Sequence, residues 1–314
     1  MEAKRIYEGK VLTTKQNQQS AIVSLMYNVW GRLVAAILWP FHILGIKLVY
    51  SKIRSEVGIS KAGISGGGSL PVHIDKFFEA IGVKLQNGYG LTETSPVVAA
   101  RKPDCNILGT VGLPLNYTEI KIVDIETDKP VLDGLKGIIK VRGPQVMKGY
   151  YKNESATGEV IDKDGWFNTG DLGWIAPKHS RGKSHQCGGM LVLEGRAKDT
   201  IVLSTGENVE PSELEEAAMR SKLIQQIVVV GQDQRRLGAL IVANKDEVLK
   251  VVKNLSEENS NLTKIEMINL LYSDLRSCTS RCSYQIGPIL IVDEPFTVNS
   301  LTSFLNFYSL INNH

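Results

Sequence analysis

The sequence predicts an α/β protein in two parts. The larger part combines an α/β sheet with a small antiparallel β region, and a smaller α+β domain follows it. A strand, a glycine turn, a helix and a second strand succeed one another over residues 61–90, which is the order typical of an α/β sheet. Apolar and polar residues alternate over residues 108–150 between Gly and Pro turns, as in antiparallel strands. After Arg196 the pattern changes to a helix between short strands, which predicts the second domain.

Composition sets the limits for function. The 314 residues suffice for about two domains. A net charge of +3 is too small to favour nucleic acid, so no nucleic-acid partner is expected. The four cysteines lack C-x-x-C spacing, which argues against a zinc site and a disulfide framework. His179, His185 and Cys187 lie close together in a Gly/Ser/Lys-rich stretch, where solvated side chains are expected more than a metal site. The charged N-terminus resembles neither a secretory signal nor a transit peptide.

Residues 33–50 form the most apolar segment, and their length approaches a membrane span. Pro40, His42, Gly45 and Lys47 interrupt it. Two buried core helices broken at Pro40 are the first expectation. An amphipathic element on a membrane surface, with tryptophans at the interface, is the second, and a spanning helix is the third. Peripheral membrane contact through residues 20–50 therefore stays open.

The α/β unit begins with a strand at Lys61, followed by the glycine turn SGGGSLP. A helix is expected over HIDKFFEAIG, with Pro71 near its first turn and Gly82 as its end. VKLQNGYG is expected to be a short buried strand that opens into a loop. TEIKIVD and KGIIKVRGP are expected strands of the β region.

In the second domain, PSELEEAAMRS predicts a helix that begins near Pro211 or Ser212. IQQIVVVGQD, GALIVANKD and GPILIVDEPF predict strands, and the stretch that ends in LLYSDLRS predicts a helix. The expected domains are 1–195, 196–297 and an atypical polar–aromatic tail over 298–314. The first contains an apolar helical segment over 20–55, a nucleotide-site region over 56–107 and a β-rich region over 108–195.

Four motifs carry residue types suited to nucleotide chemistry. The glycines of SGGGSLP let backbone approach a flat or anionic ligand. NGYGLTETSP supplies an aromatic ring, hydroxyls and the carboxylate of Glu93 in one loop. Asp171 of GWFNTGDLG is suited to both hydroxyls of a ribose, and Arg196 of LEGRAKD donates in a forked geometry. Taken singly, each has a plain alternative: a surface turn, a solvated carboxylate or an Asp–Arg ion pair.

In combination, the motifs resemble the adenylate-forming superfamily of acyl-CoA synthetases, luciferases and peptide-synthetase adenylation domains. SGGGSLP, NGYGLTE, VRGPQVMKGYY, GWFNTGDLG, LEGRAKD and STGENVEPSELE follow one another in family order between about residues 50 and 297. The strings KAGISGGGSLPVHIDKFFEAIG and CGGMLVLEGRAKDTIVLSTGENVEP are similar in particular to the plant plastid acyl–acyl carrier protein synthetases. The fold implied is a partial large adenylate-forming domain followed by the small C-terminal domain.

The resemblance implies a role for each motif residue. ATP and Mg²⁺ are the implied cofactors, and Glu93 is the implied metal ligand. Thr92 would bind the α-phosphate, Lys198 would be the hinge, and these two residues with Glu93 form the implied catalytic set. Tyr89 would stack on adenine, Asp171 and Arg196 would bind the ribose, and Gly206 would line the pantetheine tunnel. The implied nucleotide and cofactor contacts are Gly67, Gly68, Ser69, Asn87, Gly88, Tyr89, Gly90, Leu91, Thr92, Asp171, Arg196 and Gly206.

The implied reaction activates a long-chain fatty acid as an acyl-adenylate and passes it to the thiol of acyl carrier protein or CoA, in a plastid. Two parts of the family pattern are missing from the given residues. Residues 1–60 contain no Ser/Thr/Gly-rich phosphate loop, and residues 298–314 contain no lysine to bridge the carboxylate and the α-phosphate. The rival expectation is therefore a non-catalytic nucleotide-binding fragment or a membrane-associated pseudoenzyme.

Overall fold

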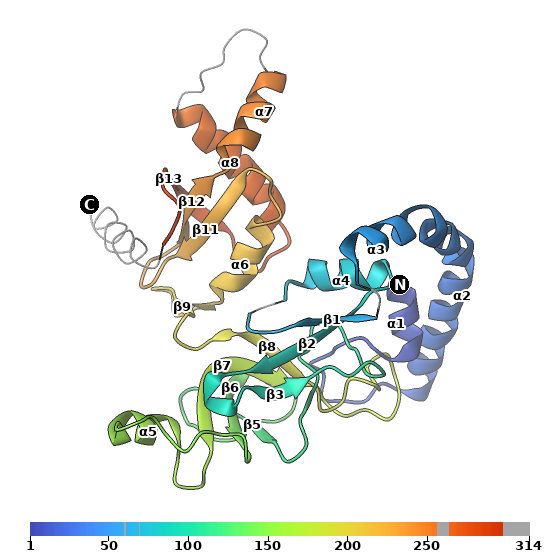
Figure 1. Cartoon of the computed structure of the whole chain (residues 1–314), viewed down its shortest axis with the longest axis vertical. Coiled ribbons are helices and arrows are strands. Elements are labelled where there is room, and N and C mark those ends of the chain that lie inside the picture. The colour runs from blue at the N-terminus through green and yellow to red at the C-terminus, as the bar shows by residue number, and fades with distance from the viewer. Residues whose placement is uncertain (60, 69, 256–263, 298–314) are drawn as a thin grey trace. The chain divides into compact units, whose positions relative to one another are not determined.

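The computed structural model describes residues 1–59, 61–68, 70–255 and 264–297. Contacts divide the chain into two compact units, Met1–Ala197 and a second that begins at Lys198. Ser69 and the tail over 298–314, both named above, lie outside the described residues. Figure 1 shows the elements of each unit.

The first sheet of unit 1 holds the glycine-rich motifs. Its strand order is β1-β2-β3-β4, with β1 parallel to β2 and the other pairs antiparallel. The helix α4 connects β1 to β2, begins directly after Pro71, and is followed by Gly82 in a left-handed conformation. The strand–turn–helix–strand prediction is thus confirmed. The bounds are β1 Ala62–Ser65, α4 Val72–Ala80, β2 Lys84–Gly90, β3 Val97–Ala100 and β4 Leu113–Pro114.

The second sheet of unit 1 is an antiparallel meander in the order β5-β6-β7-β8. Its alternating residues bury Ile122, Ile139 and Val141 in a core that also includes Tyr89 and Val98 of the first sheet. The period-two pattern therefore predicted this β region correctly. The bounds are β5 Glu119–Val123, β6 Gly137–Arg142, α5 Glu154–Val160, β7 Phe167–Ile175 and β8 Leu191–Arg196.

Unit 2 is an α+β domain with a three-stranded sheet in the order β11-β12-β13. The central strand β12 is buried at every position, and Leu214, Leu271 and Leu275 of its helices pack in the same core. The predicted helix start at Pro211 and the three predicted strands are confirmed. The bounds are β9 Ile201–Val202, β10 Asn208–Val209, α6 Pro211–Ala218, β11 Ile224–Val230, β12 Leu237–Ala243, α7 Lys245–Leu255, α8 Lys264–Thr279 and β13 Ile286–Val292.

The N-terminal segment departs from the sequence prediction. In place of two core helices broken at Pro40, one helix α2, Ala21–Gly45, runs through the proline, and only Gly31 in it is buried. Proline removes a single backbone hydrogen bond, and the surrounding helix continues across the gap. The π-helical turn η1, Ile46–Tyr50, and α3, Ser51–Val57, extend the helical stretch.

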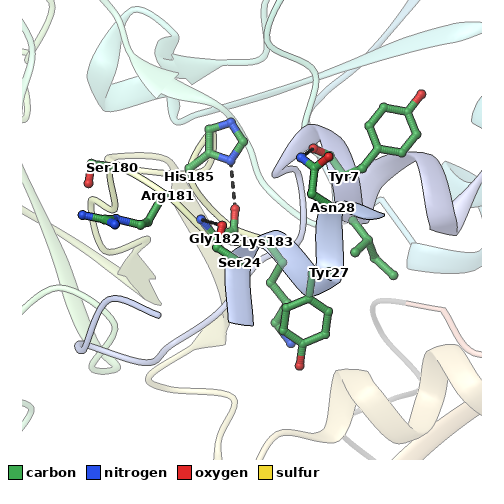
Figure 2. A pocket seen from close by; sticks show the side chains of 10 residues that line it. Tyr7, Ser24, Tyr27, Asn28, Ser180, Arg181, Gly182, Lys183 and His185 are labelled. Carbon is green, nitrogen blue, oxygen red and sulfur yellow. Dashed lines mark hydrogen bonds between the residues drawn. The ribbon is translucent and has the colours of Figure 1, made fainter. Parts of the chain in front are cut away.

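Helix α2 packs along α1, Glu2–Glu8, and beside the loop that contains Ser180 and His185 (Figure 2). The stretch Ala21–Val57 is long and apolar enough to cross a membrane, and none of its most apolar window is buried within the protein. The expectation of buried core helices is therefore wrong, because most of these apolar side chains face outward.

Candidate functional site

The glycine-rich turn and the end of β2 lie at one edge of the first sheet. Because β1 and β2 are parallel and pair Ser65 with Asn87, the residues that follow each strand emerge together. A Cβ built on Gly90 would lie 1.6 Å from the carbonyl oxygen of Pro96, so only glycine fits at this close approach. At Gly67 the reason is conformational: its φ is +80°, and the space around it is open.

A hydrogen-bonded chain joins three of the predicted site residues. Asp171 lies in β7 directly opposite Arg196 in β8. The Tyr89 hydroxyl donates to Oδ2 of Asp171 at 2.6 Å, and Nε of Arg196 lies 3.2 Å from Oδ1. Residues 82 positions apart in the sequence thus meet at one carboxylate.

The Asp171 carboxylate is largely buried, and its neighbours hold it in place. The Asp171 side chain is 11% exposed, whereas that of Arg196 is 62% exposed. The backbone N–H of Asp171 donates to the Thr169 hydroxyl at 3.1 Å, which fixes the strand at this point. Burial raises the pKa of Tyr89, and the neighbouring Asp171 charge raises it further. Tyr89 therefore remains a hydrogen-bond donor, and since the residue is only 7% exposed, a stacking base would meet a small part of its ring.

The turn η2, Thr92–Thr94, presents the second group of predicted residues. Thr92 is exposed, and the neighbouring Thr94 is fully buried and fixes the turn by accepting from the N–H of Leu91. The carboxylate of Glu93 accepts a hydrogen bond from the Tyr150 hydroxyl at 3.0 Å, and the Glu93 carbonyl accepts from the N–H of Met147 at 2.8 Å. The segment that follows β6 therefore holds Glu93 at both its backbone and its side chain.

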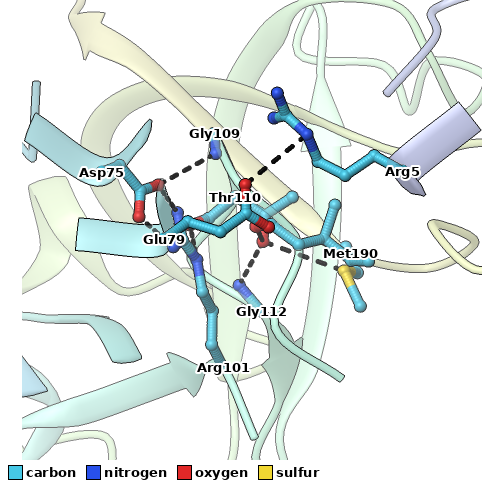
Figure 3. A network of polar contacts seen from close by, with 9 residues as sticks. Arg5, Asp75, Glu79, Arg101, Gly109, Thr110, Gly112 and Met190 are labelled. Carbon is cyan, nitrogen blue, oxygen red and sulfur yellow. Dashed lines mark hydrogen bonds and ion pairs between the residues drawn. The ribbon is translucent and has the colours of Figure 1, made fainter. Parts of the chain in front are cut away.

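A buried ion pair fixes the helix that follows the glycine turn (Figure 3). Asp75 of α4 and Arg101 are 2% and 4% exposed, and their bidentate contacts measure 3.0 and 2.8 Å. Nε of Arg101 also donates to the Thr110 carbonyl at 2.7 Å, and the N–H of Arg101 donates to the Asn87 carbonyl at 2.9 Å. The network ties α4 to the strand that carries Tyr89. It also includes Gly109, whose N–H donates to Asp75.

Two predicted residues belong to unit 2. Lys198 is exposed and is the first residue of that unit. Gly206 lies in the turn between β9 and β10, where its φ is +85° and a Cβ would meet nothing within 4 Å. Among the residues that the structure describes, no cluster of three or more His, Cys, Asp or Glu side chains could hold a metal ion. The hypothetical site at His179, His185 and Cys187 thus has no such cluster, and a single carboxylate such as Glu93 would need ligands from a bound nucleotide.

Comparison with known proteins identifies the family. A model of the AMP-binding enzyme family matches residues 15–151, and a model of the AMP-binding enzyme C-terminal domain matches residues 198–273. The chain belongs to the AMP-binding enzyme family. The resemblance inferred from the motifs is confirmed, and both matches follow the order of the two units.

Two plant proteins similar to this chain agree with that assignment. The chloroplastic long-chain-fatty-acid–[acyl-carrier-protein] ligase AEE15 of Arabidopsis thaliana is 63% identical over 96% of this chain and 40% of its own length. The probable acyl-activating enzyme 16, chloroplastic, of the same plant is 63% identical over 95% of this chain and 42% of its own length. The chain thus spans about two fifths of the length of these relatives.

A solved structure supports the fold. The A domain of carboxylic acid reductase from Segniliparus rugosus, in complex with AMP and a co-purified carboxylic acid, matches with a TM-score of 0.56 at 28% identity. The match covers 75% of this chain and 34% of that one. The predicted fold, part of an adenylate-forming large domain followed by a smaller domain, is therefore confirmed.

Several residues that shape the site were not predicted. Tyr150 is part of the VRGPQVMKGYY motif, but nothing in the sequence links it to Glu93, 57 residues away. Asp75 and Arg101 were also missed, because a charged residue in a helix and one after a strand usually face water. The sequence does contain one signal for this pair, which is the position of Arg101 directly after the apolar strand β3. A side chain at this position either enters the protein core or points into solvent.

Proposed function

We propose that this chain carries the nucleotide-binding part of an enzyme that activates a long-chain fatty acid with ATP. The observation that carries the proposal is the chain of hydrogen bonds from Tyr89 through Asp171 to Arg196. It concentrates a buried carboxylate, an aromatic hydroxyl and a mostly exposed guanidinium at one place. A carboxylate of this kind suits the two hydroxyls of a ribose, and the guanidinium suits ribose or phosphate oxygens.

One unsatisfied atom supports the fit of an adenine nucleotide. Oδ1 of Asn87 is buried and has no hydrogen-bond partner among the described residues. A buried acceptor without a donor is unfavourable, and an exocyclic amino group of a base would satisfy it. Asn87 lies beside the turn of Gly67 and Gly68, where open space leaves room for a flat ligand.

The residues of the η2 turn would act on the phosphates. The exposed hydroxyl of Thr92 would donate to the α-phosphate, and the Glu93 carboxylate would hold Mg²⁺ in the orientation that Tyr150 sets. When bound, Mg²⁺ would neutralise phosphate charge as the fatty carboxylate attacks the α-phosphorus and pyrophosphate leaves. A phosphopantetheine thiol would then attack the acyl carbonyl and release AMP.

The acceptor thiol would belong to acyl carrier protein or CoA, and the plastid would be the compartment. Chloroplastic relatives, one of them named as an acyl-carrier-protein ligase, support both choices. In unit 2, Lys198 would serve as the hinge, and the turn at Gly206 would face the pantetheine arm. The positive φ of Gly206 and the open space around it suit a position that a narrow ligand passes.

The direct test is titration calorimetry of AMP and Mg²⁺-ATP against the 314-residue chain. Asp171→Asn should weaken AMP binding by about 10- to 100-fold, because hydrogen bonds to a charged group contribute about 1.5–3 kcal/mol. Asp133→Asn, at an exposed carboxylate in unit 1, is the matched control and should leave AMP binding unchanged. Equal AMP affinity of the two variants would refute the assignment of Asp171 to the nucleotide.

The rival function is nucleotide binding without catalysis. Hydroxylamine trapping separates the two: with ATP, Mg²⁺ and a long-chain fatty acid, a catalytic chain yields acyl-hydroxamate and pyrophosphate. A chain that binds AMP and forms neither product favours the rival.

A further inference from the structure

Helix α2 has the reverse of the polarity expected for a helix on a water-soluble protein. The side that faces the protein carries small and polar residues, among them Ser24, Asn28 and Gly31. Nδ2 of Asn28 donates to the Tyr7 carbonyl at 3.4 Å. A Cβ on Gly31 would lie 2.9 Å from the carbonyl oxygen of Ala3, so α1 and α2 approach closely there. A helix on the surface of a water-soluble protein would instead bury its apolar side against the rest of the protein.

The opposite side of α2 is apolar and open. Seven of its apolar residues are between 59% and 74% exposed: Ile22, Leu25, Met26, Val29, Trp30, Ile37 and Phe41. Apolar side chains exposed together along a helix mark an interaction surface rather than ordinary solvent exposure. Trp30 and Trp39 belong to the same helix, and tryptophan favours the boundary between hydrocarbon and water.

A basic pocket opens beside the N-terminal part of this helix (Figure 2). The cavity has a volume of about 170 Å³ and is lined by α1, α2 and the loop over residues 180–185. Arg181, Lys183 and His185 line it, and no carboxylate among the described residues does. The Lys183 ammonium lies 5.5 Å from the centre of the Tyr27 ring, and Ser24 accepts from the N–H of Gly182 at 3.0 Å. Cations and hydroxyls without a counter-charge form a site for an anion such as a phosphate group.

Two stretches of sequence beside the pocket carry charge of a single sign, although α1 also contributes Glu2 and Glu8. Residues 9–55 contain six Lys and Arg and no Asp or Glu. Residues 172–193, which include the loop, contain three Lys and Arg and again no acidic residue. The whole chain has a net charge of only +3, so positive charge is concentrated at these two segments. Such clusters beside an apolar helix attract an anionic lipid surface.

We propose that α2 and the basic pocket form a binding site for an anionic lipid bilayer, in which the pocket of Arg181 and Lys183 takes a lipid phosphate. The helix lies in the plane of the interface with its apolar side toward the acyl chains. A spanning orientation is disfavoured because α1 packs along α2 and would bring Glu2, Arg5 and Glu8 into the hydrocarbon. The site would hold the protein where long-chain fatty acids dissolve, so the inference goes beyond nucleotide binding and does not depend on it.

The test is flotation of the 314-residue chain with phosphatidylcholine vesicles that contain or lack phosphatidylglycerol. The wild-type chain should bind the anionic vesicles, with a blue shift of tryptophan emission and quenching by brominated lipid. Arg181→Glu with Lys183→Glu should weaken binding by at least about tenfold, because each basic residue near an anionic surface contributes about fivefold. Lys129→Glu with Lys163→Glu makes the same charge change at exposed positions elsewhere in unit 1 and should have a much smaller effect.

A second pair of variants tests the helix. Leu25→Asp with Val29→Asp alters exposed side chains, so circular dichroism should stay unchanged while vesicle binding is lost. Equal binding to neutral and anionic vesicles, or no effect of the Arg181 and Lys183 changes, would overturn the proposal. Displacement by inorganic phosphate at matched ionic strength would overturn it in favour of a soluble phosphate ligand. Self-association without vesicle binding would overturn it in favour of a second copy of the chain.

Discussion

Replacing Asp75 with alanine should destabilise unit 1 strongly while unit 2 stays folded. Asp75 neutralises Arg101, whose side chain is 1% exposed and makes two contacts of 3.0 and 2.8 Å with the carboxylate. Without Asp75, a guanidinium remains buried with the Thr110 carbonyl as its one other acceptor among the described residues. Breaking a buried ion pair from one side costs about 3–5 kcal/mol. With a urea m-value of about 2–3 kcal/mol/M, the midpoint should fall by about 1–2.5 M.

The assay uses the position of the tryptophans. All four, Trp30, Trp39, Trp166 and Trp174, lie in unit 1, so urea unfolding followed by tryptophan fluorescence reports this unit alone. Circular dichroism then reports both units. Glu119→Ala is the control, because it breaks an exposed arginine–carboxylate pair in the same unit and should leave the midpoint nearly unchanged.

Two results would refute the reasoning. A midpoint for Asp75→Ala equal to that of Glu119→Ala would mean that water reaches Arg101 and that the pair contributes little. A double variant, Asp75→Leu with Arg101→Met, should recover much of the lost stability, because paired apolar groups replace a pair of desolvated charges. A double variant less stable than Asp75→Ala would mean that shape, not charge, determines this contact.

Three further predictions use other parts of the chain. Tyr150→Phe should weaken Mg²⁺-ATP binding by about tenfold and leave AMP binding unchanged, because it removes the hydroxyl that orients Glu93; calorimetry with AMP as reference measures this. Burial raises the pKa of the Cys187 thiol to about 12, so its contribution to stability is complete below about pH 9 and is lost as pH rises toward 12. The melting temperatures of the wild type and of Cys187→Ala should therefore converge as pH rises over that range. A difference in melting temperature that stays constant with pH would contradict this prediction. Trypsin should cut first near Lys198, after which two fragments persist; an earlier cut within a strand would contradict the division into two units.

The sequence predicted local structure well where periodicity and turn residues agree. The β1–α4–β2 unit is an example, since Pro71 and Gly82 mark the helix and the apolar residues of VKLQNGYG mark the strand. It failed at α2, where apolar composition was equated with burial. Composition states how apolar a helix is, but which side packs depends on the partner helix, and the sequence contains no signal that α1 meets α2 at Gly31.

The order of the motifs sufficed to identify the family and to select Tyr89, Asp171 and Arg196 as site residues. Only the tertiary structure decided that Tyr89 and Arg196 both contact the Asp171 carboxylate. Strand pairing brings Asp171 opposite Arg196, and Tyr89 packs in the core shared by both sheets. It also decided that Tyr150 holds Glu93 and that Arg101 holds Asp75. The physical reason is that a motif records residue types along the chain, whereas a hydrogen bond or an ion pair depends on distances that folding sets between segments far apart in sequence.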